Sequence, residues 1–229
     1  MRDLQRLDLS PYLAAFAVYA RNPVVALAPL AAALAQVLLS QVFGAMMFSS
    51  LIAYLIQGFG IGVAIITADL AWRRGRSVFD TAWTEAQRKA PDLLMATLGF
   101  GFVMFAAGLI GGMLGSVGVV LQLLAFGFLI YTLPASAIGG IPGGAALQVS
   151  VERARANPAT TVVLAIVSLA VYIGVTVFAA ESITMQVVLM TGSAIAGTVA
   201  LAFLQALAFG YIAIVLAKVY ADISYGRRY

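Results

Sequence analysis

The side chains that could do chemistry are few, and their types exclude most catalytic mechanisms. The chain contains no cysteine and no histidine, so it has no thiol nucleophile, no imidazole base and no metal site built from these ligands. Nine acidic and thirteen basic side chains are left, and no two carboxylates are spaced as a proton relay. The sequence therefore predicts a protein that is not an enzyme and that carries no metal or cofactor.

Three carboxylates lie within or beside apolar segments, where an ionisable group is a functional candidate by default. Asp69 precedes Arg73 by four residues, a spacing that predicts an ion pair on one helical face. Asp92 directly follows Pro91, where a carboxylate stabilises the positive N-terminal end of a helix. Glu181 is interpreted as a surface charge. All three therefore have structural explanations that we prefer to a transport or coupling-ion role.

Three glutamines occupy similar positions in the sequence. Gln57, Gln122 and Gln205 each lie three to five residues before the glycine of a Phe-Gly pair. Amide side chains inside a membrane form hydrogen bonds between helices. The three could therefore lock neighbouring helices together, or they could line a polar pocket. Interhelical hydrogen bonding is the commoner role, and both interpretations are kept.

Basic side chains cluster in the connections between apolar segments. Near an anionic leaflet, each such side chain contributes about 1 kcal/mol of attraction, so these residues are candidates for binding lipid headgroups. The alternative is that they only set the topology. Nucleic-acid binding is not expected, because the basic residues lie in short loops without interleaved aromatic residues. The candidates are Arg73, Arg74, Arg76, Arg88, Lys89, Arg153 and Arg155.

The elements that carry these residues belong to a membrane protein. Of the 229 residues, 63% are hydrophobic and only 10% are charged, and the mean hydropathy is +1.03. A soluble domain is about half apolar and about a quarter charged. Because a transmembrane helix needs about 20 apolar residues, the sequence predicts an all-α fold with six spans. They cover approximately residues 23 to 43, 46 to 70, 92 to 113, 116 to 138, 158 to 180 and 196 to 220.

The distribution of charge predicts the orientation. All thirteen basic residues lie on one side of the six-span topology, and the opposite connections carry only Glu181. By the positive-inside rule, the basic side and both termini are cytoplasmic. The charged residues of the first 20 positions argue against a cleavable signal peptide. We therefore expect a multi-pass membrane protein with its N-terminus retained.

A proline that follows basic residues and opens an apolar segment occurs three times along the chain and predicts an internal repeat. Pro23, Pro91 and Pro158 each follow basic residues and open an apolar span, and they are separated by 68 and 67 residues. Regular spacing indicates three parallel two-helix repeats within a single transmembrane domain, residues 1–229. Their predicted ranges are 4–72, 78–140 and 145–222, with an insertion at 181–195 that is either an extended external helix or a re-entrant segment.

Each repeat is predicted to begin with a cytoplasmic helix that lies in the membrane interface. In residues 78–89, the apolar Phe79, Ala82 and Trp83 share one helical face, opposite a charged face. Residues 145–156 show the same pattern less cleanly. Residues 4–20 form a more apolar version.

The stretch LPASAIGGIPGGAALQVSVERARANPATTVVLAIV, residues 133–167, resembles a pattern in a diffuse bacterial superfamily of six-span inner-membrane proteins. That superfamily includes the membrane domain fused to some glycerophosphodiester phosphodiesterases. The resemblance lies in Leu133-Pro134, a glycine-containing turn, Ala146-Leu147 with Ser150, and a basic pair before a new span. Relatives often carry an acidic residue in the turn, which is uncharged here. The resemblance implies architecture and a loose association with lipid.

Together these features predict a non-enzymatic inner-membrane protein that acts through lipid or membrane-protein contacts, as an accessory, scaffolding or membrane-organising subunit. Its expected partners are membrane lipids, other integral membrane proteins or further copies of itself. The alternative is a small-solute or lipid transporter with a pocket along a pseudo-threefold axis, lined by the three glutamines.

Overall fold

The computed structural model of the chain describes residues 9–43 and 47–226, apart from the side chains of residues 47 and 178–181. In these residues every regular secondary-structure element is a helix, and turns or bends connect the helices. Six helical segments are long and apolar enough to cross a membrane, as the sequence predicts. The termini and the connection at residues 44–46 lie outside the described residues, and so do the predictions that concern Arg2, Arg6, Arg227 and Arg228.

The six segments form three helical hairpins. The first consists of a 3-10 turn, η1 (Pro23–Ala26), helix α2 (Leu27–Phe43) and helix α3 (Met47–Arg74). The second consists of α5 (Ala90–Met113) and α6 (Ser116–Leu129), which continues into the short α7 (Thr132–Ala137). The third consists of α9 (Pro158–Ile173), a π-helical segment (Gly174–Ala179), α10 (Ala180–Thr191) and α11 (Ala194–Tyr225).

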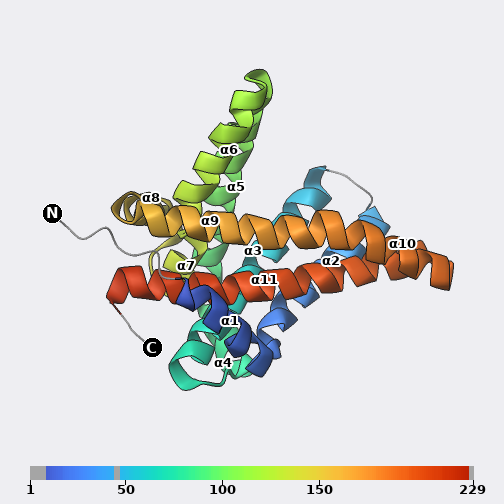
Figure 1. Cartoon of the computed structure of the whole chain (residues 1–229), viewed down its shortest axis with the longest axis horizontal. Helices are drawn as coiled ribbons and strands as arrows, with labels where there is room; N and C mark the ends of the chain where they lie inside the picture. The colour runs from blue at the N-terminus through green and yellow to red at the C-terminus, as the bar shows by residue number, and fades with distance from the viewer. Residues whose placement is uncertain (1–8, 44–46, 227–229) are drawn as a thin grey trace.

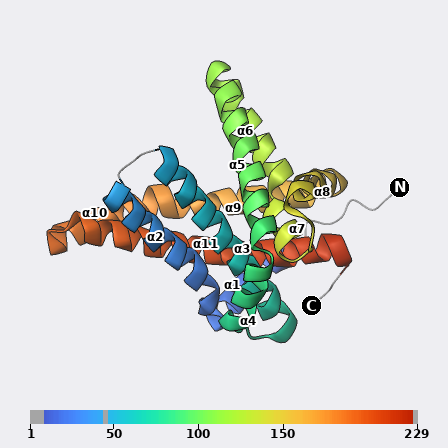
Figure 2. The same cartoon turned by 180° about the vertical axis from the view of Figure 1, so that it is seen from behind.

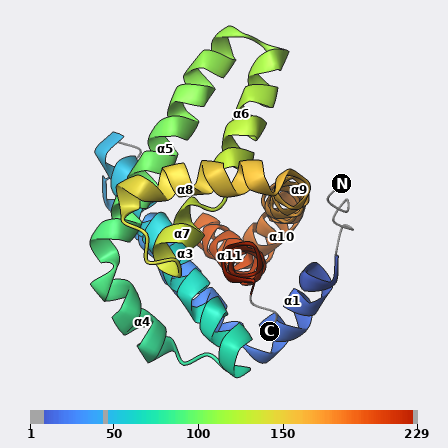
Figure 3. The same ribbon diagram turned by 90° about the vertical axis from the view of Figure 1, so that its left-hand side faces the viewer.

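A short helix precedes each hairpin: α1 (Ser10–Arg21), α4 (Phe79–Arg88) and α8 (Gly143–Ala156). Figure 3 shows them on three sides of α11 and α7. In α4 the predicted amphipathic pattern is present, because Ala82 and Ala86 are fully buried while Asp80, Thr84 and Arg88 are exposed. Their position relative to a membrane interface stays a prediction.

The core lies at the end of the hairpins where these short helices pack. Val63 and Ile65 of α3, Ile214 and Val215 of α11 and Tyr131 after α6 are all at most 1% exposed. Toward the far ends, the hairpins diverge, and the α5/α6 hairpin points away from α9, α10 and α11 (Figures 1 and 2). The far ends of the hairpins expose large apolar side chains. We call the end where α1, α4 and α8 pack the base, and the outer part of each hairpin an arm.

Glycines hold α5 against α3. A Cβ atom at Gly58 would overlap the side chain of Thr97, and one at Gly62 would lie 2.9 Å from Leu93 Cδ2. Tyr54 lies one turn before Gly58 in α3, and its hydroxyl donates a hydrogen bond to the Thr97 carbonyl at 3.2 Å. The four-residue spacing of the glycines therefore serves close packing of two helices within one chain.

A serine of α8 compensates for the helix break between α6 and α7. The Ser150 hydroxyl donates to the Phe128 carbonyl at 2.8 Å and accepts from the Tyr131 backbone N–H at 3.0 Å. Ser150 and Tyr131 are both fully buried. Because the Tyr131 N–H is buried, it depends on this hydroxyl for its hydrogen bond.

The junctions before Pro23 and Pro158 have nearly the same backbone conformation. Asn22 has φ −133° and ψ 59°, and Asn157 has φ −133° and ψ 60°. In both, the side-chain amide donates to the carbonyl four residues earlier, at 3.0 Å and 3.2 Å. Only Asn22 also accepts from the Ser77 backbone N–H, at 2.9 Å. The first junction is therefore tied to the connection between α3 and α4.

This difference makes the two asparagines a matched pair. We expect Asn22→Ala to lower the free energy of unfolding by about 2 kcal/mol, because it leaves the Ser77 N–H without its acceptor. Asn157→Ala should cost less than half as much. Thermal unfolding of the detergent-solubilised variants measures both, and equal losses would contradict the proposed role of the link to Ser77.

The insertion at 181–195 is largely helical, and whether it is external or re-entrant stays a prediction. It continues α9 through the π-helical segment into α10, turns at Gly192 (φ +67°) and enters α11. The resulting apolar segment Pro158–Thr191 has 34 residues and α11 has 32. At 1.5 Å per residue both are about 50 Å long, whereas the hydrocarbon of a bilayer is about 30 Å thick. The third hairpin must therefore tilt strongly or project from the membrane.

The threefold repeat stays a prediction. The three prolines lie at the first or second position of a helix, as the pattern predicts. The Phe-Gly pairs, however, do not pack alike. A Cβ at Gly60 would meet Ala32 at 2.8 Å, one at Gly210 would meet the Tyr19 hydroxyl at 2.7 Å, and one at Gly127 would meet nothing within 4 Å.

Candidate functional site

The predicted basic cluster is spread over the base, and part of it is bound internally. Arg73 forms a two-point contact with Asp69, through Nε to Oδ1 at 3.0 Å and Nη2 to Oδ2 at 2.7 Å. The predicted ion pair is therefore confirmed. The Asp69 side chain is only 8% exposed, so the charge of Arg73 offsets that of a largely buried carboxylate.

Lys89 joins two elements of the base. Its Nζ donates to the Ala137 carbonyl at 2.7 Å and to Glu85 Oε1 at 2.8 Å. Ala137 is the last residue of α7, where the helix leaves carbonyl groups without intrahelical partners. A cation at this end also interacts favourably with the helix dipole. These contacts give Lys89 a structural role.

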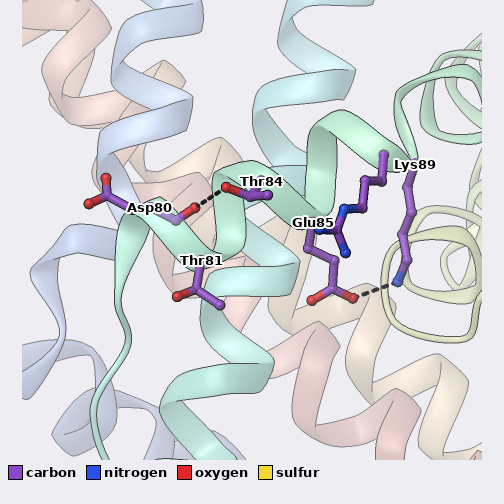
Figure 4. Close-up of a pocket in the computed structure, with 6 residues that line it drawn as sticks. Asp80, Thr81, Thr84, Glu85 and Lys89 are labelled. Carbon is purple, nitrogen blue, oxygen red and sulfur yellow. Dashed lines mark hydrogen bonds and ion pairs between the residues drawn. The ribbon is translucent and has the colours of Figure 1, made fainter.

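Other members of the cluster are more accessible. Arg74, Arg76 and Arg88 are exposed, and the Arg155 guanidinium lies 6.0 Å from the centre of the Phe128 ring. Arg153 is half-buried in α8. Figure 4 shows the hollow on the outer side of α4, which has a volume of about 590 Å³. Its lining residues are Asp80, Thr81, Thr84, Glu85, Arg88 and Lys89.

The hollow carries both signs of charge. Asp80 lies toward one end and Lys89 toward the other (Figure 4), and Arg88 is also among the lining residues. Glu85 is paired with Lys89, and the neighbouring Arg88 is exposed. A headgroup phosphate at this face would therefore interact with one arginine and not with the whole predicted cluster.

The three glutamines lie in three separate hairpins. Gln57 accepts a hydrogen bond from Gln36 Nε2 at 2.9 Å, and the same nitrogen lies 3.1 Å from the Ala53 carbonyl. This contact joins α2 to α3, which is the interhelical role. Gln122 is exposed on α6 beside Gly108, and Gln205 is half-buried in α11. Within the described part of the chain, no hydrogen bond joins these three glutamines to one another.

Asp92 and Glu181 are the other two carboxylates that the sequence identifies as candidates. Asp92 lies in the first turn of α5, as expected, but its Oδ1 accepts from the Gly143 backbone N–H at 3.2 Å. It therefore stabilises the N-terminus of α8 as well, a contact between residues far apart in sequence. Glu181 belongs to α10, and its side chain lies outside the described residues.

Sequence reasoning missed a set of polar aromatic residues in the base. The Tyr211 hydroxyl donates to the Tyr12 carbonyl at 3.0 Å, and Trp72 Nε1 donates to the Ile214 carbonyl at 2.9 Å. The Tyr131 hydroxyl lies 3.1 Å from Thr161 Oγ1. Each bond joins different elements. The available signal was the position of these aromatic residues near one end of their spans, since tyrosine and tryptophan favour sites that are apolar with one polar contact.

Burial, with smaller contributions from the neighbouring Tyr131 and Tyr211, raises the pKa of Tyr12 to about 12. Because this value exceeds the ordinary 10.0, the contribution of Tyr12 to stability is complete below pH 10 and is lost as the pH rises toward 12. Tyr12→Phe should therefore leave stability at pH 7 nearly unchanged and move the alkaline unfolding midpoint upward. Unfolding followed against pH tests this, with Tyr225→Phe as an exposed control; an unchanged midpoint for Tyr12→Phe would contradict it.

Each ion pair described in the base joins residues four positions apart on one helical face, and the two lysines involved, Lys89 and Lys218, also contact a second helix. The Lys218 Nζ lies 2.6 Å and 2.8 Å from the two Asp222 oxygens in the same helix. It also lies 5.8 Å from the centre of the Trp72 ring, which belongs to α3. In the described ranges, no group of three acidic, cysteine or histidine residues is placed to hold a metal ion.

Comparison with known proteins adds no relative. No family model, no curated protein and no solved structure matches the chain at a significant level.

Proposed function

We propose that the protein is a non-enzymatic component of the bacterial inner membrane that works through contacts with lipids or other membrane proteins. Its role would be that of an accessory, scaffolding or membrane-organising subunit. The proposed orientation has the basic connections and both termini in the cytoplasm. The resemblance of residues 133–167 to the six-span superfamily supports the same compartment and an association with lipid.

The observation that carries this proposal is the isolation of the outer part of the α5/α6 hairpin. Phe105 is 65% exposed on α5, Met113 is 88% exposed at the end of α5, and Val120 is 54% exposed on α6. The inner side is closed by direct packing of Gly111 against Gly118. This arm therefore offers apolar side chains on its outward surfaces, which only lipid or another membrane protein can cover.

A second support comes from the charged side chains. Asp69 pairs with Arg73, Glu85 pairs with Lys89, and Asp222 pairs with Lys218. Each pair lies along one helical face, where the two opposite charges offset each other. The exposed arginines would then contribute attraction to anionic headgroups.

Native mass spectrometry of the protein extracted with its surrounding membrane tests the proposal. We expect a stoichiometric polypeptide or an enriched lipid class to accompany the chain. Phe105→Ala, on the isolated arm, should lower the yield of that companion severalfold. Leu189→Ala provides the matched control, because this residue is 76% exposed on a different hairpin.

The transporter alternative predicts a different result. A bound solute that raises the melting temperature, and that loses this effect in Gln57→Leu, Gln122→Leu and Gln205→Leu, would replace our proposal with a polar pathway between the hairpins. If the glutamines only join helices, their replacement lowers stability and leaves every solute response unchanged.

A further inference from the structure

Helix α1 is apolar on both of its faces. On the inner face, Tyr12 is 7% exposed and Ala15 is fully buried. On the outer face, Leu13 is 71% exposed and Phe16 is 59% exposed. Arg21, at the last position, is the one charged residue between Ser10 and Arg21. A helix that is apolar all round is not an interfacial amphipathic helix, which needs a polar face toward water.

Helix α1 also crosses α11 instead of running along it. Tyr12 accepts from the Tyr211 hydroxyl, Phe16 lies 4.4 Å from the Tyr211 ring centre to centre, and Tyr19 packs on Gly210. Tyr12 and Tyr19 are about 10 Å apart along α1, at 1.5 Å per residue, yet their contacts on α11 are adjacent residues. Figure 3, in which α11 is seen nearly end-on, shows α1 extending across that view.

The crossing point lies well inside the apolar part of α11. Tyr211 precedes Lys218 by about 10 Å and Tyr225 by about 21 Å of helix. The apolar side chains of α11 continue on both sides of this point. The crossing point therefore lies on the apolar part of α11, about 10 Å of helix from Lys218, the nearest charged residue of that helix.

Helices α4 and α8, unlike α1, carry charged side chains on their outward faces. The outward residues of α4 include Asp80 and Arg88, and those of α8 include Glu152 and Arg155, all of them exposed. Such faces require water or headgroups. The contrast places α1 deeper than α4 and α8, although the three helices occupy similar positions in the chain.

We propose that α1 lies in the plane of the membrane within the hydrocarbon of the leaflet nearer the basic connections, and that Leu13 and Phe16 contact the acyl chains of that leaflet. The occupant is lipid because the exposed side chains between Leu13 and Ala20 are all apolar and without a hydrogen-bonding group, whereas Ser10 and Arg21 lie only at the two ends of α1. This inference rests on the proposed function only in that the chain lies in a bilayer.

Since the chain has no cysteine, single nitroxide labels test the depth of each helix directly. Leu13→Cys reports on α1, and the exposed positions Thr81→Cys and Gln148→Cys report on α4 and α8 as matched controls. The labelled proteins are reconstituted in vesicles of phosphatidylcholine and phosphatidylglycerol. Oxygen concentrates in hydrocarbon and a neutral nickel chelate stays in water, so the ratio of their collision rates with the label measures depth.

We expect the ratio of oxygen to nickel collisions to be severalfold higher at position 13 than at positions 81 and 148. A ratio at position 13 equal to the two controls would overturn the proposal, because α1 would then lie at the water boundary. Low collision rates with both reagents would also overturn it, because a second copy of the chain would then cover this face.

Phe16→Cys, on the same face, repeats the measurement if Leu13→Cys does not fold, as judged by its thermal unfolding. The result is independent of the companion sought by native mass spectrometry. A protein with no enriched lipid or polypeptide could still give the expected depth, and a protein with a companion could still fail this test.

Discussion

Replacing Gly58 with valine is expected to separate α5 from α3 and to lower the stability of the protein by roughly 3 kcal/mol. A Cβ at this position already overlaps the Thr97 side chain, and Thr97 is 2% exposed with its hydroxyl bonded to the Leu93 carbonyl at 2.8 Å. The threonine therefore has no free space into which it can turn. Because α5 carries the whole second hairpin, its displacement should also break the bond from Tyr54 to the Thr97 carbonyl.

The loss is measured as a fall in the thermal unfolding midpoint of the detergent-solubilised protein. Gly112→Val is the matched control, because a Cβ at Gly112 meets nothing within 4 Å. Both substitutions place the same β-branched side chain inside α3 or α5, so helix propensity changes equally. Similar midpoints for the two variants would show that the α3–α5 contact does not limit stability.

Ser150→Ala is expected to cost about 2 kcal/mol, because it leaves the buried Tyr131 N–H and the partly buried Phe128 carbonyl without this partner. The Tyr131 N–H and the Phe128 carbonyl both lie at the break between α6 and α7 and both bond to this hydroxyl. The variant should also lose protection of the Tyr131 amide against hydrogen exchange. Ser150→Thr should retain part of the stability, since it keeps the hydroxyl.

Ser168→Ala provides the control for removal of a buried hydroxyl. Ser168 is 4% exposed, and within the part of the chain that the structure describes its Oγ has no hydrogen-bond partner. Its replacement should therefore cost nothing or stabilise the protein slightly. Comparable losses for Ser150→Ala and Ser168→Ala would contradict the bridging role of Ser150.

The sequence by itself determined the local features of this protein. The six apolar segments follow from composition and from the thickness of a bilayer, which act on each segment separately. The Asp69–Arg73 pair follows from a four-residue spacing on one helix, and the prolines at helix starts follow from their missing N–H groups. The burial of Ala82 and Ala86 in α4 follows from helical periodicity.

The residues of the candidate site were only partly predictable, for a physical reason. Whether Lys89 meets a headgroup or the Ala137 carbonyl, and whether Gln57 meets Gln36 or a pocket, depends on which helices pack together. These contacts join residues 21 to 48 positions apart. In a membrane, hydropathy does not select helix neighbours, because lipid is as apolar as the helices themselves.

Only the tertiary structure decided the close approach of Gly58 to Thr97, the second role of Asp92 at the start of α8 and the crossing of α1 over α11. Each depends on shape and hydrogen-bond geometry between distant segments, and none changes the hydropathy pattern. The insertion at 181–195 illustrates the same limit, because Glu181 and Gln186 interrupt the apolar pattern while α10 continues as far as Thr191. Sequence thus determined which segments are apolar, and packing between helices decided where each polar side chain finds its partner.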